Sequence, residues 1–326
     1  MLVYSVPQLL AALKASAAGA VITLAPGDWR LVTITGFQGA VTINGPGAVL
    51  YDLTIQYSSG LDLEGLELST IGHAPGEWGA ANTIGFYVLN SSNITLNGFK
   101  VHGAPNGTLA TEISGLQVRA SDHVTVSNGD FHNLHWAVED VDDSYLQIIG
   151  NHFHDNMDDG LRGGGSSNVL VQGNACDSNH PDGGDTDHPD CIQFWSEAGV
   201  VPHDITITGN SYTRGAGLPT QGIFISDQIG NLPFVRLTIE NNTITGAGYN
   251  GITVNDAAGL VMKNNIVCPY PDQQSWITLE VIAGGTLTDN QSTLYKILNS
   301  TSVLQAGDTS VATCQPDAGH APAPAG

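Results

Sequence analysis

The sequence contains little charge, and very little of that charge is positive. Only 12% of its 326 residues are Asp, Glu, Lys or Arg, and acidic residues outnumber basic ones 31 to 9, for a formal net charge of −22. Because such a surface repels phosphate groups, nucleic acid and anionic membranes are not expected partners. A polyanionic polysaccharide would also be repelled unless a cation or local Arg and Lys offset the field.

Long apolar runs and abundant cysteine are missing as well. No apolar run approaches the ~18 residues of a membrane span. The opening MLVYSVPQLLAALKASAAGA has no basic residue before its apolar part, which predicts a helix and no visible signal peptide. Four cysteines without a CxxC pair favour buried free thiols, and a Cys268–Cys314 bridge stays open.

The chain is rich in glycine, with 40 residues, and in short apolar alternations that repeat. Five segments carry two apolar positions eight residues apart: Phe86 and Ile94, Leu116 and Val124, Val138 and Leu146, Leu161 and Val169, Ile252 and Leu260. An asparagine follows the second apolar position, or its equivalents Ile205 and Leu237, by five residues at Asn151, Asn174, Asn210, Asn242 and Asn265. The asparagines lie 23, 36, 32 and 23 residues apart, which predicts a 23-residue unit with insertions. A unit this short cannot bury a core alone, so it must stack. Each asparagine is expected to adopt the left-handed conformation and to hydrogen-bond its own copy one coil away, as an asparagine ladder.

This repeat resembles the right-handed parallel β-helix of the pectate-lyase-like superfamily over about residues 20–300. The opening VPQLLAALKASAAGAVITLAPGDWRL is similar to the superfamily's start, where a helix caps the first coil before an L-x-P-G-x-(W/Y) turn. The resemblance implies an all-β fold: one parallel β-helix domain over residues 1–313 with a short N-terminal capping helix. Residues 314–326, rich in Pro, Ala and Gly, are expected to form a flexible tail.

The stretch HPDGGDTDHPDCIQFW, residues 180–195, identifies the coil expected to carry the function. In plain coils the asparagine precedes the next apolar strand position by ten residues, as from Asn151 to Leu161, whereas Asn174 precedes Ile192 by eighteen. A coil that only stacks gains nothing from a longer loop, so insertions in a solenoid usually lie at its working face. The acidic cluster is therefore predicted to be a functional elaboration of one coil.

Strand alternation predicts which side chains share that face, because coils stack ~4.8 Å apart and alternate residues point outward. The residues directly after the inward positions form one outward series: Tyr87, Gln117, Glu139, Arg162, Gln193, Phe224 and Thr253. The residues two positions before the inward ones form a second series: Ser114, Trp136, Asp159, Asp190, Gln221 and Asn250. Two carboxylates, those of Asp159 and Asp190, are therefore expected in one slot on neighbouring coils.

Carboxylates held close together suit acetal cleavage, since one can donate a proton while another activates water or attacks carbon. The candidate catalytic residues are Asp159, Asp187, Asp190, Glu139, Asp158, His188 and Arg162. Aromatic rings stack on sugars and polar groups bind their hydroxyls, which adds as candidate substrate-binding residues Gln193, Trp195, Trp136, Gln117, Phe224, His154 and Arg214. His132, His135 and His152 are interpreted as face or loop residues and not as ligands.

The spacing of the acids leaves the stereochemical outcome open. Asp159 and Asp190 on adjacent coils would lie ~5 Å apart, as in a retaining pair, whereas Glu139 and Asp190 would approach the ~9 Å of an inverting pair. Short motifs resemble two hydrolase groups of the superfamily. The sequence PDCI is similar to the D-D-C-(I/L) strand start of polygalacturonases, with Pro189 in place of the first aspartate. The sequence DHPD matches the D-x-x-D spacing of O-antigen-cleaving phage tailspikes.

These resemblances imply a polysaccharide hydrolase that requires no cofactor and acts outside the cell or on a virion. For a phage protein they also imply a homotrimer. The first alternative is a calcium-assisted polysaccharide lyase, since lyases of this fold bind Ca²⁺ with acids from successive coils and use Arg or Lys as the base. In that case Glu139, Asp159 and Asp190 would hold the ion, and Arg162 or Arg214 would abstract the proton.

Two further alternatives follow from the superfamily. Uronan epimerases carry Asp-Pro-His, whereas residues 187–189 of this chain read Asp-His-Pro, so that motif does not match. A glycan-binding adhesin would use Trp195, Trp136 and Phe224 without cleaving its ligand. Because a binder gains nothing from like charges pressed together, the sequence favours an enzyme, with hydrolysis as the preferred chemistry.

Overall fold

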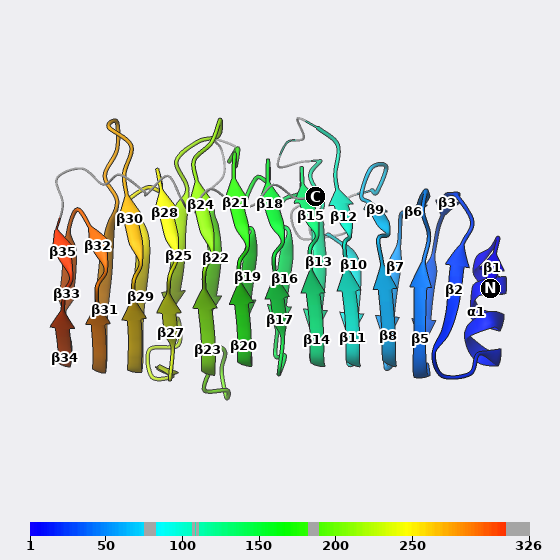
Figure 1. Cartoon of the computed structure of the whole chain (residues 1–326), viewed down its shortest axis with the longest axis horizontal. Coiled ribbons are helices and arrows are strands. Elements are labelled where there is room, and N and C mark those ends of the chain that lie inside the picture. Colours follow the sequence, from blue (N-terminus) through cyan, green and yellow to red (C-terminus); the bar gives the residue numbers. More distant parts are fainter. Residues whose placement is uncertain (75–82, 106–107, 109–110, 182–188, 311–326) are drawn as a thin grey trace.

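A computed structural model of the chain describes residues 1–74, 83–105, 108, 111–181 and 189–310. The chain winds into coils that stack along the long axis of the molecule, and α1 (Val6–Ala15) covers the N-terminal end (Figure 1). Each strand pairs in parallel with the equivalent strand of the next coil, so that the strands form three rows. The predicted all-β, parallel β-helix with an N-terminal capping helix is therefore confirmed.

The three rows contain all the strands of the described residues. The first row consists of β4 (Val32–Thr35), β7 (Leu53–Gln56), β10 (Ile84–Leu89), β13 (Ser114–Arg119), β16 (Val138–Val141), β19 (Leu161–Gly164), β22 (Asp190–Trp195), β25 (Gln221–Ser226), the first halves of β29 (Asn250–Lys263) and β31 (Trp276–Thr288), and β33 (Tyr295–Leu298). The second row consists of β1 (Leu2–Val3), β2 (Ala20–Leu24), β5 (Gln38–Asn44), β8 (Ser59–Glu64), β11 (Ser92–Asn97), β14 (Asp122–Ser127), β17 (Gln147–Ile149), β20 (Ser167–Gln172), β23 (His203–Thr208), β26 (Phe234–Val235), β27 (Thr238–Glu240), the second halves of β29 and β31, and β34 (Thr301–Ala306). The third row consists of β3 (Gly27–Trp29), β6 (Ala48–Leu50), β9 (Glu67–Ser69), β12 (Lys100–His102), β15 (Asp130–His132), β18 (His152–His154), β21 (Ala175–Asp177), β24 (Ser211–Thr213), β28 (Thr243–Thr245), β30 (Ile266–Cys268), β32 (Gln291–Ser292) and β35 (Thr309–Ser310).

Helix α1 closes the open end of the first coil. Ser5 is its N-cap and accepts a hydrogen bond from the Gln8 backbone N–H at 3.4 Å, while Gln8 Oε1 accepts one from the Tyr4 backbone at 2.8 Å. Leu9 and Leu13 are buried on the face that packs against the coil. The helix thus covers apolar surface that stacking alone would leave exposed.

The core is the column of inward side chains that the repeat predicts. All ten apolar residues of the five aligned pairs are at most 2% exposed. On the third row Phe131 and Phe153 stack from coil to coil, with ring centroids 5.4 Å apart. Since each coil covers the inward residues of its neighbour, the hydrophobic effect holds the stack together.

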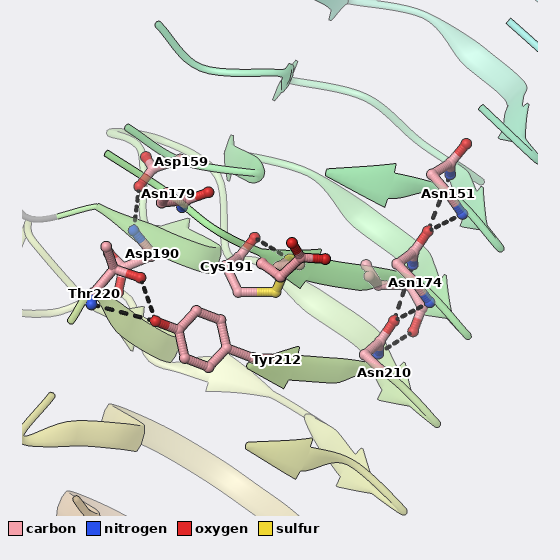
Figure 2. The surroundings of a disulfide bond; sticks show 12 residues. Asn151, Asp159, Asn174, Asn179, Asp190, Cys191, Asn210, Tyr212 and Thr220 are labelled. Atoms are coloured by element: carbon pink, nitrogen blue, oxygen red, sulfur yellow. Dashed lines mark hydrogen bonds between the residues drawn. A yellow bond between two sulfur atoms is a disulfide. The ribbon is translucent and has the colours of Figure 1, made fainter. Parts of the chain in front are cut away.

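The asparagines form a hydrogen-bonded ladder inside one corner of the β-helix (Figure 2). The backbone N–H and side-chain amide of Asn151 both donate to Asn174 Oδ1, at 2.9 and 3.0 Å. The same pair of bonds repeats at Asn210, Asn242 and Asn265 and extends beyond the predicted rungs to Asn290 and Asp308.

One detail of the asparagine prediction is corrected. The left-handed backbone belongs to the residue before each ladder asparagine, namely Gly150, Gly173, Gly209, Asn241 and Asn264, with φ between 54 and 65°. The turn needs a residue that tolerates positive φ, whereas the ladder needs an amide side chain directed into the corner. The residue before the asparagine therefore forms the turn, and the asparagine itself forms the ladder hydrogen bonds.

Replacing Asn210 with alanine is expected to destabilise the fold by about 2–3 kcal/mol. Its Oδ1 accepts both bonds from Asn174 and its amide also donates to the Val171 carbonyl at 3.0 Å, so truncation leaves several buried polar groups without partners. Urea unfolding measures the loss. Asn231→Ala, at an exposed loop position, is the matched control and should stay within about 0.5 kcal/mol of the parent. Equal midpoints for both variants would show that the ladder does not stabilise the stack.

The possible Cys268–Cys314 bridge and the predicted domain boundary both depend on residues outside the described ranges. Cys268 is buried and free, whereas Cys314 lies outside the described residues. The boundary between residues 313 and 314 also falls outside them, so the domain division stays a prediction. No helix within the described ranges is long and apolar enough to cross a membrane.

Candidate functional site

The predicted outward series is confirmed on the first row. Strand register pairs its members coil by coil in the order Tyr87, Gln117, Glu139, Arg162, Gln193, Phe224 and Thr253. Asp190 pairs with Gln221 in the second series. Residues remote in sequence therefore line one face of the stack.

Arg162 is the centre of a carboxylate cluster on this face. Its Nε lies 3.5 Å from Glu139 Oε1, and its Nη1 lies 3.4 Å from Asp158 Oδ2 and 3.6 Å from Asp159 Oδ2. Gln117 donates from Nε2 to the other oxygen of Glu139 at 2.5 Å. Strand β16 supplies Glu139, and the turn before β19 supplies both aspartates, so one guanidinium offsets three like charges from two coils.

Two indole rings flank the guanidinium of Arg162. Its central carbon lies 5.2 Å from the ring centroid of Trp195 and 5.9 Å from that of Trp136, within range of cation–π attraction. Trp136 is buried, whereas Trp195 and Phe224 on the next two coils are half-buried. Trp195 and Phe224 therefore leave aromatic surface available beside the carboxylates.

The predicted pair of Asp159 and Asp190 is brought together by a backbone contact (Figure 2). The Asp190 N–H donates to Asp159 Oδ1 at 2.8 Å, and Gln193 Nε2 donates to Asp190 Oδ2 at 3.1 Å. Asp158 and Asp159 take part in the same turn before β19. The pair thus joins the Arg162 cluster to β22, the strand that follows the insertion.

The expected exposure of these aspartates is corrected. Asp158, Asp159 and Asp190 are only 3%, 2% and 0% exposed, whereas the side chain of Glu139 is 15% exposed. The ladder of backbone bonds continues through the turn, from Ala137 N to Asp159 O and from Gly160 N to Asp190 O, so neighbouring coils cover it. Glu139 is therefore the carboxylate of the cluster that meets solvent.

A disulfide between Cys176 and Cys191 corrects the expectation of free thiols. It joins β21 to β22 across the insertion, and Cys191 directly follows Asp190 (Figure 2). A Cβ at Gly160 would lie 2.8 Å from the Cys191 carbonyl oxygen and 3.2 Å from Cys176 Sγ, so this close approach requires glycine. The sequence signal was present, because the two cysteines bracket the acidic insertion. The bridge fixes both ends of the insertion next to the carboxylates.

Sequence reasoning missed the buried carboxyl of Glu112 and interpreted His135, which is also buried, as a face or loop residue. His135 Nε2 lies 4.0 Å from Asp158 Oδ2, and both side chains are about 4% exposed. Glu112, two residues before β13, is 3% exposed, and burial raises the pKa of its carboxyl to about 8. Its Oε1 lies 3.7 Å from His180 Nε2. Glu112 belongs to a segment without the repeat pattern, so no spacing pointed to it.

Two predicted substrate-binding residues contact other groups. His154 lies on β18 of the third row, where it contacts Asp130 and Asp155. Arg214 directly follows β24 of the same row and donates to Asp272 and Gln273 at 2.8 and 2.7 Å. Their assignment to the cluster is wrong, because both belong to the third-row side of their coils. Asp187 and His188 lie outside the described residues.

The cluster on the first row does not fit a calcium site in the part of the chain that the structure describes. Calcium requires six to eight oxygen ligands. Here the oxygens of Glu139, Asp158 and Asp159 surround the guanidinium of Arg162, which occupies the position that a cation would need. A positive side chain, Arg162, is therefore already placed among these acids.

Comparison with known proteins supports the right-handed coil. The family model described as "Right handed beta helix region" matches residues 84–267. No curated protein matches the sequence significantly. Solved structures with a similar fold include the A-module of a mannuronan C-5 epimerase from Azotobacter vinelandii, with 15% identity, a TM-score of 0.66, and coverage of 93% of this chain and 88% of that one.

Two other solved structures share the fold at similar distance. A family 28 exopolygalacturonase from Yersinia enterocolitica is 11% identical, with a TM-score of 0.60 over 96% of this chain and 76% of that one. The Dettilon tailspike protein is 12% identical, with a TM-score of 0.68 over 94% of this chain and 66% of that one. At such low identity these likenesses describe the fold alone.

Proposed function

The chain belongs to the right-handed β-helix family, and from the site on its first row we propose that it cleaves a polysaccharide by glycoside hydrolysis. The observation that carries the proposal is the set of contacts from Arg162 to Glu139, Asp158 and Asp159 beside two indole rings. Carboxylates gathered beside aromatic surface suit both the binding and the cleavage of a sugar chain. The fold neighbours named for an exopolygalacturonase and a mannuronan epimerase support a polysaccharide as the substrate class.

In this mechanism Glu139 is the carboxylate that meets the substrate. It points outward from β16, is the most exposed acid of the cluster, and is held in place by Gln117 and Arg162. Glu139 activates the water or attacks the anomeric carbon. The carboxyl of Asp159 or Asp190 protonates the leaving oxygen. The contact of Arg162 Nε with Glu139 Oε1 at 3.5 Å orients the carboxylate for this role.

The electrostatics favour a neutral or weakly charged polysaccharide. The chain carries a formal charge of −22, and the positive charge of Arg162 is already offset by three carboxylates. A uronan would meet a repulsive field with no free cationic side chain in the described cluster. Trp195, Phe224 and Gln193 would instead bind sugar rings and hydroxyls. Action on such a substrate places the protein outside the cell or on a virion.

The lyase alternative would use Arg162 or Arg214 as the base. Arg214 contacts Asp272 on the third-row side of its coil, away from the cluster. Arginine is also effectively always protonated in proteins, which disfavours it as a base. The guanidinium of Arg162 lies between the acids that a calcium ion would need as ligands. The hydrolase therefore agrees better with the described cluster.

Polysaccharide panels test the proposed function directly. We expect new reducing ends without the ultraviolet absorbance of an unsaturated uronate, and no loss of rate with a chelator. Ultraviolet-absorbing product that disappears with the chelator would identify a lyase instead. Binding of a polysaccharide, measured by quenching of tryptophan fluorescence, with no product on any substrate would identify an adhesin.

A further inference from the structure

A second group of titratable side chains lies on the third row, away from the Arg162 cluster. Three consecutive strands, β15, β18 and β21, read Asp-Phe-His, His-Phe-His and Ala-Cys-Asp. Their central residues point into the core and are at most 1% exposed. The flanking residues therefore point outward, and the polar ones are Asp130, His132, His152, His154 and Asp177.

Three of these outward side chains, Asp130, His152 and His154, lie close together. His154 Nε2 lies 2.8 Å from Asp130 Oδ1, and His152 Nε2 lies 2.7 Å from Asp177 Oδ2. One ligand atom from each of Asp130, His152 and His154 lies within 4.8 Å of the others. The two imidazole rings stack, with centroids 4.4 Å apart. Two nitrogens and at least one carboxylate oxygen are thus presented together.

We propose that Asp130, His152 and His154 bind one divalent transition-metal ion of the zinc class. Imidazole nitrogen with carboxylate oxygen is a donor set that Zn²⁺, Co²⁺ and Ni²⁺ accept. Zinc bonds of about 2.0–2.2 Å place tetrahedral ligands about 3.3 Å apart, so small side-chain rotations from the observed positions bring the three donors onto one ion. Asp177 or water completes the coordination.

The surroundings of His154 match those of a metal-binding histidine. Its Nδ1 lies 2.6 Å from Asp155 Oδ2, and a carboxylate on the second ring nitrogen fixes the tautomer and directs Nε2 toward a metal. A metal ion held by His154 Nε2 and Asp130 Oδ1 would replace the contact that joins these two atoms at 2.8 Å.

The site is both accessible and rigid. The side chains of Asp130, His152 and His154 are 47%, 43% and 21% exposed, so an ion can reach them from solvent. All three belong to strands whose alternate residues are fixed in the core. His132 stacks on His154 with centroids 4.9 Å apart and restricts its ring from the other side. Ligands on rigid strands lose little entropy when they bind.

An ion at this position would join two coils at the start of a functional segment. Asp130 lies on β15 and both histidines on β18, and the chain continues from His154 directly into the turn that carries Asp158 and Asp159. The proposed ion is structural and takes no part in cleavage. The inference is therefore independent of the proposed hydrolysis.

Zinc titration of the tag-free, metal-stripped full chain tests the site. We expect saturable binding of one Zn²⁺ per chain by calorimetry, a higher Tm with Zn²⁺, and a visible absorption band with Co²⁺. His152→Ala and Asp130→Ala should each weaken Zn²⁺ binding at least about tenfold. His203→Ala is the matched control. His203 is a half-buried second-row histidine that contacts Asp204 at 2.8 Å, so this variant should bind Zn²⁺ as the parent does.

Three results would overturn the proposal. These are the absence of saturable Zn²⁺ binding by the parent chain, parental affinity in both ligand variants, and an equal loss in His203→Ala. Circular dichroism establishes that each variant is folded before titration. The half-exposed positions of His152 and Asp130 make loss of folding an unexpected outcome, and the parent titration alone decides the proposal if either variant fails to fold.

Discussion

Replacing Glu139 with glutamine is expected to lower kcat on the polysaccharide substrate by about 10²–10⁴-fold and to leave the fold intact. Glutamine has the same shape but cannot act as base or nucleophile. Its amide oxygen can still accept the hydrogen bond from Gln117 Nε2. The side chain is partly exposed, so the loss of its ion pair with Arg162 costs little stability. Reducing-end assays measure kcat, and thermal unfolding checks stability.

The matched control is Glu280→Gln. Glu280 occupies an outward position of the first row on β31, close to the C-terminal end of the stack, and is half-buried like Glu139. This variant should keep the parental kcat. Parental activity in Glu139→Gln would remove Glu139 from the mechanism, and an equal loss in both variants would mean that the effect is not local to the Arg162 cluster.

The fold could be predicted from sequence because each coil repeats the same local requirements. Two inward apolar positions eight residues apart recur from coil to coil, and an asparagine follows in the later coils, which is enough to indicate a stack. The predicted ladder ended at Asn265 because Gly285 replaces the apolar residue five positions before Asn290. The last rung is an aspartate, Asp308, only 18 residues after Asn290. An aspartate satisfies the same acceptor role without matching the pattern.

The site could be predicted only as far as strand register determines it. Alternation correctly placed Glu139 beside Arg162, because adjacent strands fix their relative positions. It could not predict burial, since the cover over Asp159 and Asp190 comes from neighbouring coils. His154 and Arg214 were assigned by residue type and not by their row, which is why the structure places them elsewhere. Pairing of Cys176 with Cys191 depends on the path of the insertion, which the repeat does not specify.

The burial of two carboxyl groups inside the β-helix, those of Asp140 and Asp143, was not predicted from the sequence. Asp140 pairs between Val118 and Gly163 at an inward position and is 0% exposed. A Cβ at Gly163 would lie 2.7 Å from Asp140 Oδ2, so glycine leaves the space that the carboxyl fills. Asp143, 3% exposed, accepts backbone hydrogen bonds from Ser121 and Val141 at 2.6 and 3.2 Å.

Burial makes these two groups sensitive to pH. It raises the pKa of Asp140 to about 7, and burial together with the charge of Asp140 raises the pKa of Asp143 to about 9. In the unfolded chain both pKa values are about 4. The native state therefore holds protons that the unfolded state releases, so stability falls as pH rises. The contribution of Asp140 is complete below about pH 4 and lost by about pH 7, and that of Asp143 is lost by about pH 9.

Asp140→Asn is expected to raise the free energy of unfolding at pH 8 by about 2–4 kcal/mol and to change it little at pH 4. Asparagine keeps the shape of the protonated carboxyl and an acceptor for the Ser166 hydroxyl, but it introduces no buried charge at high pH. Urea unfolding from pH 4 to pH 9 measures the difference, with Asp62→Asn, an exposed carboxyl on β8, as the control that should follow the parent. If the curves of Asp140→Asn and the parent stay parallel over this range, Asp140 is not the group that makes the stability fall, because removing a buried titrating carboxyl must change the slope.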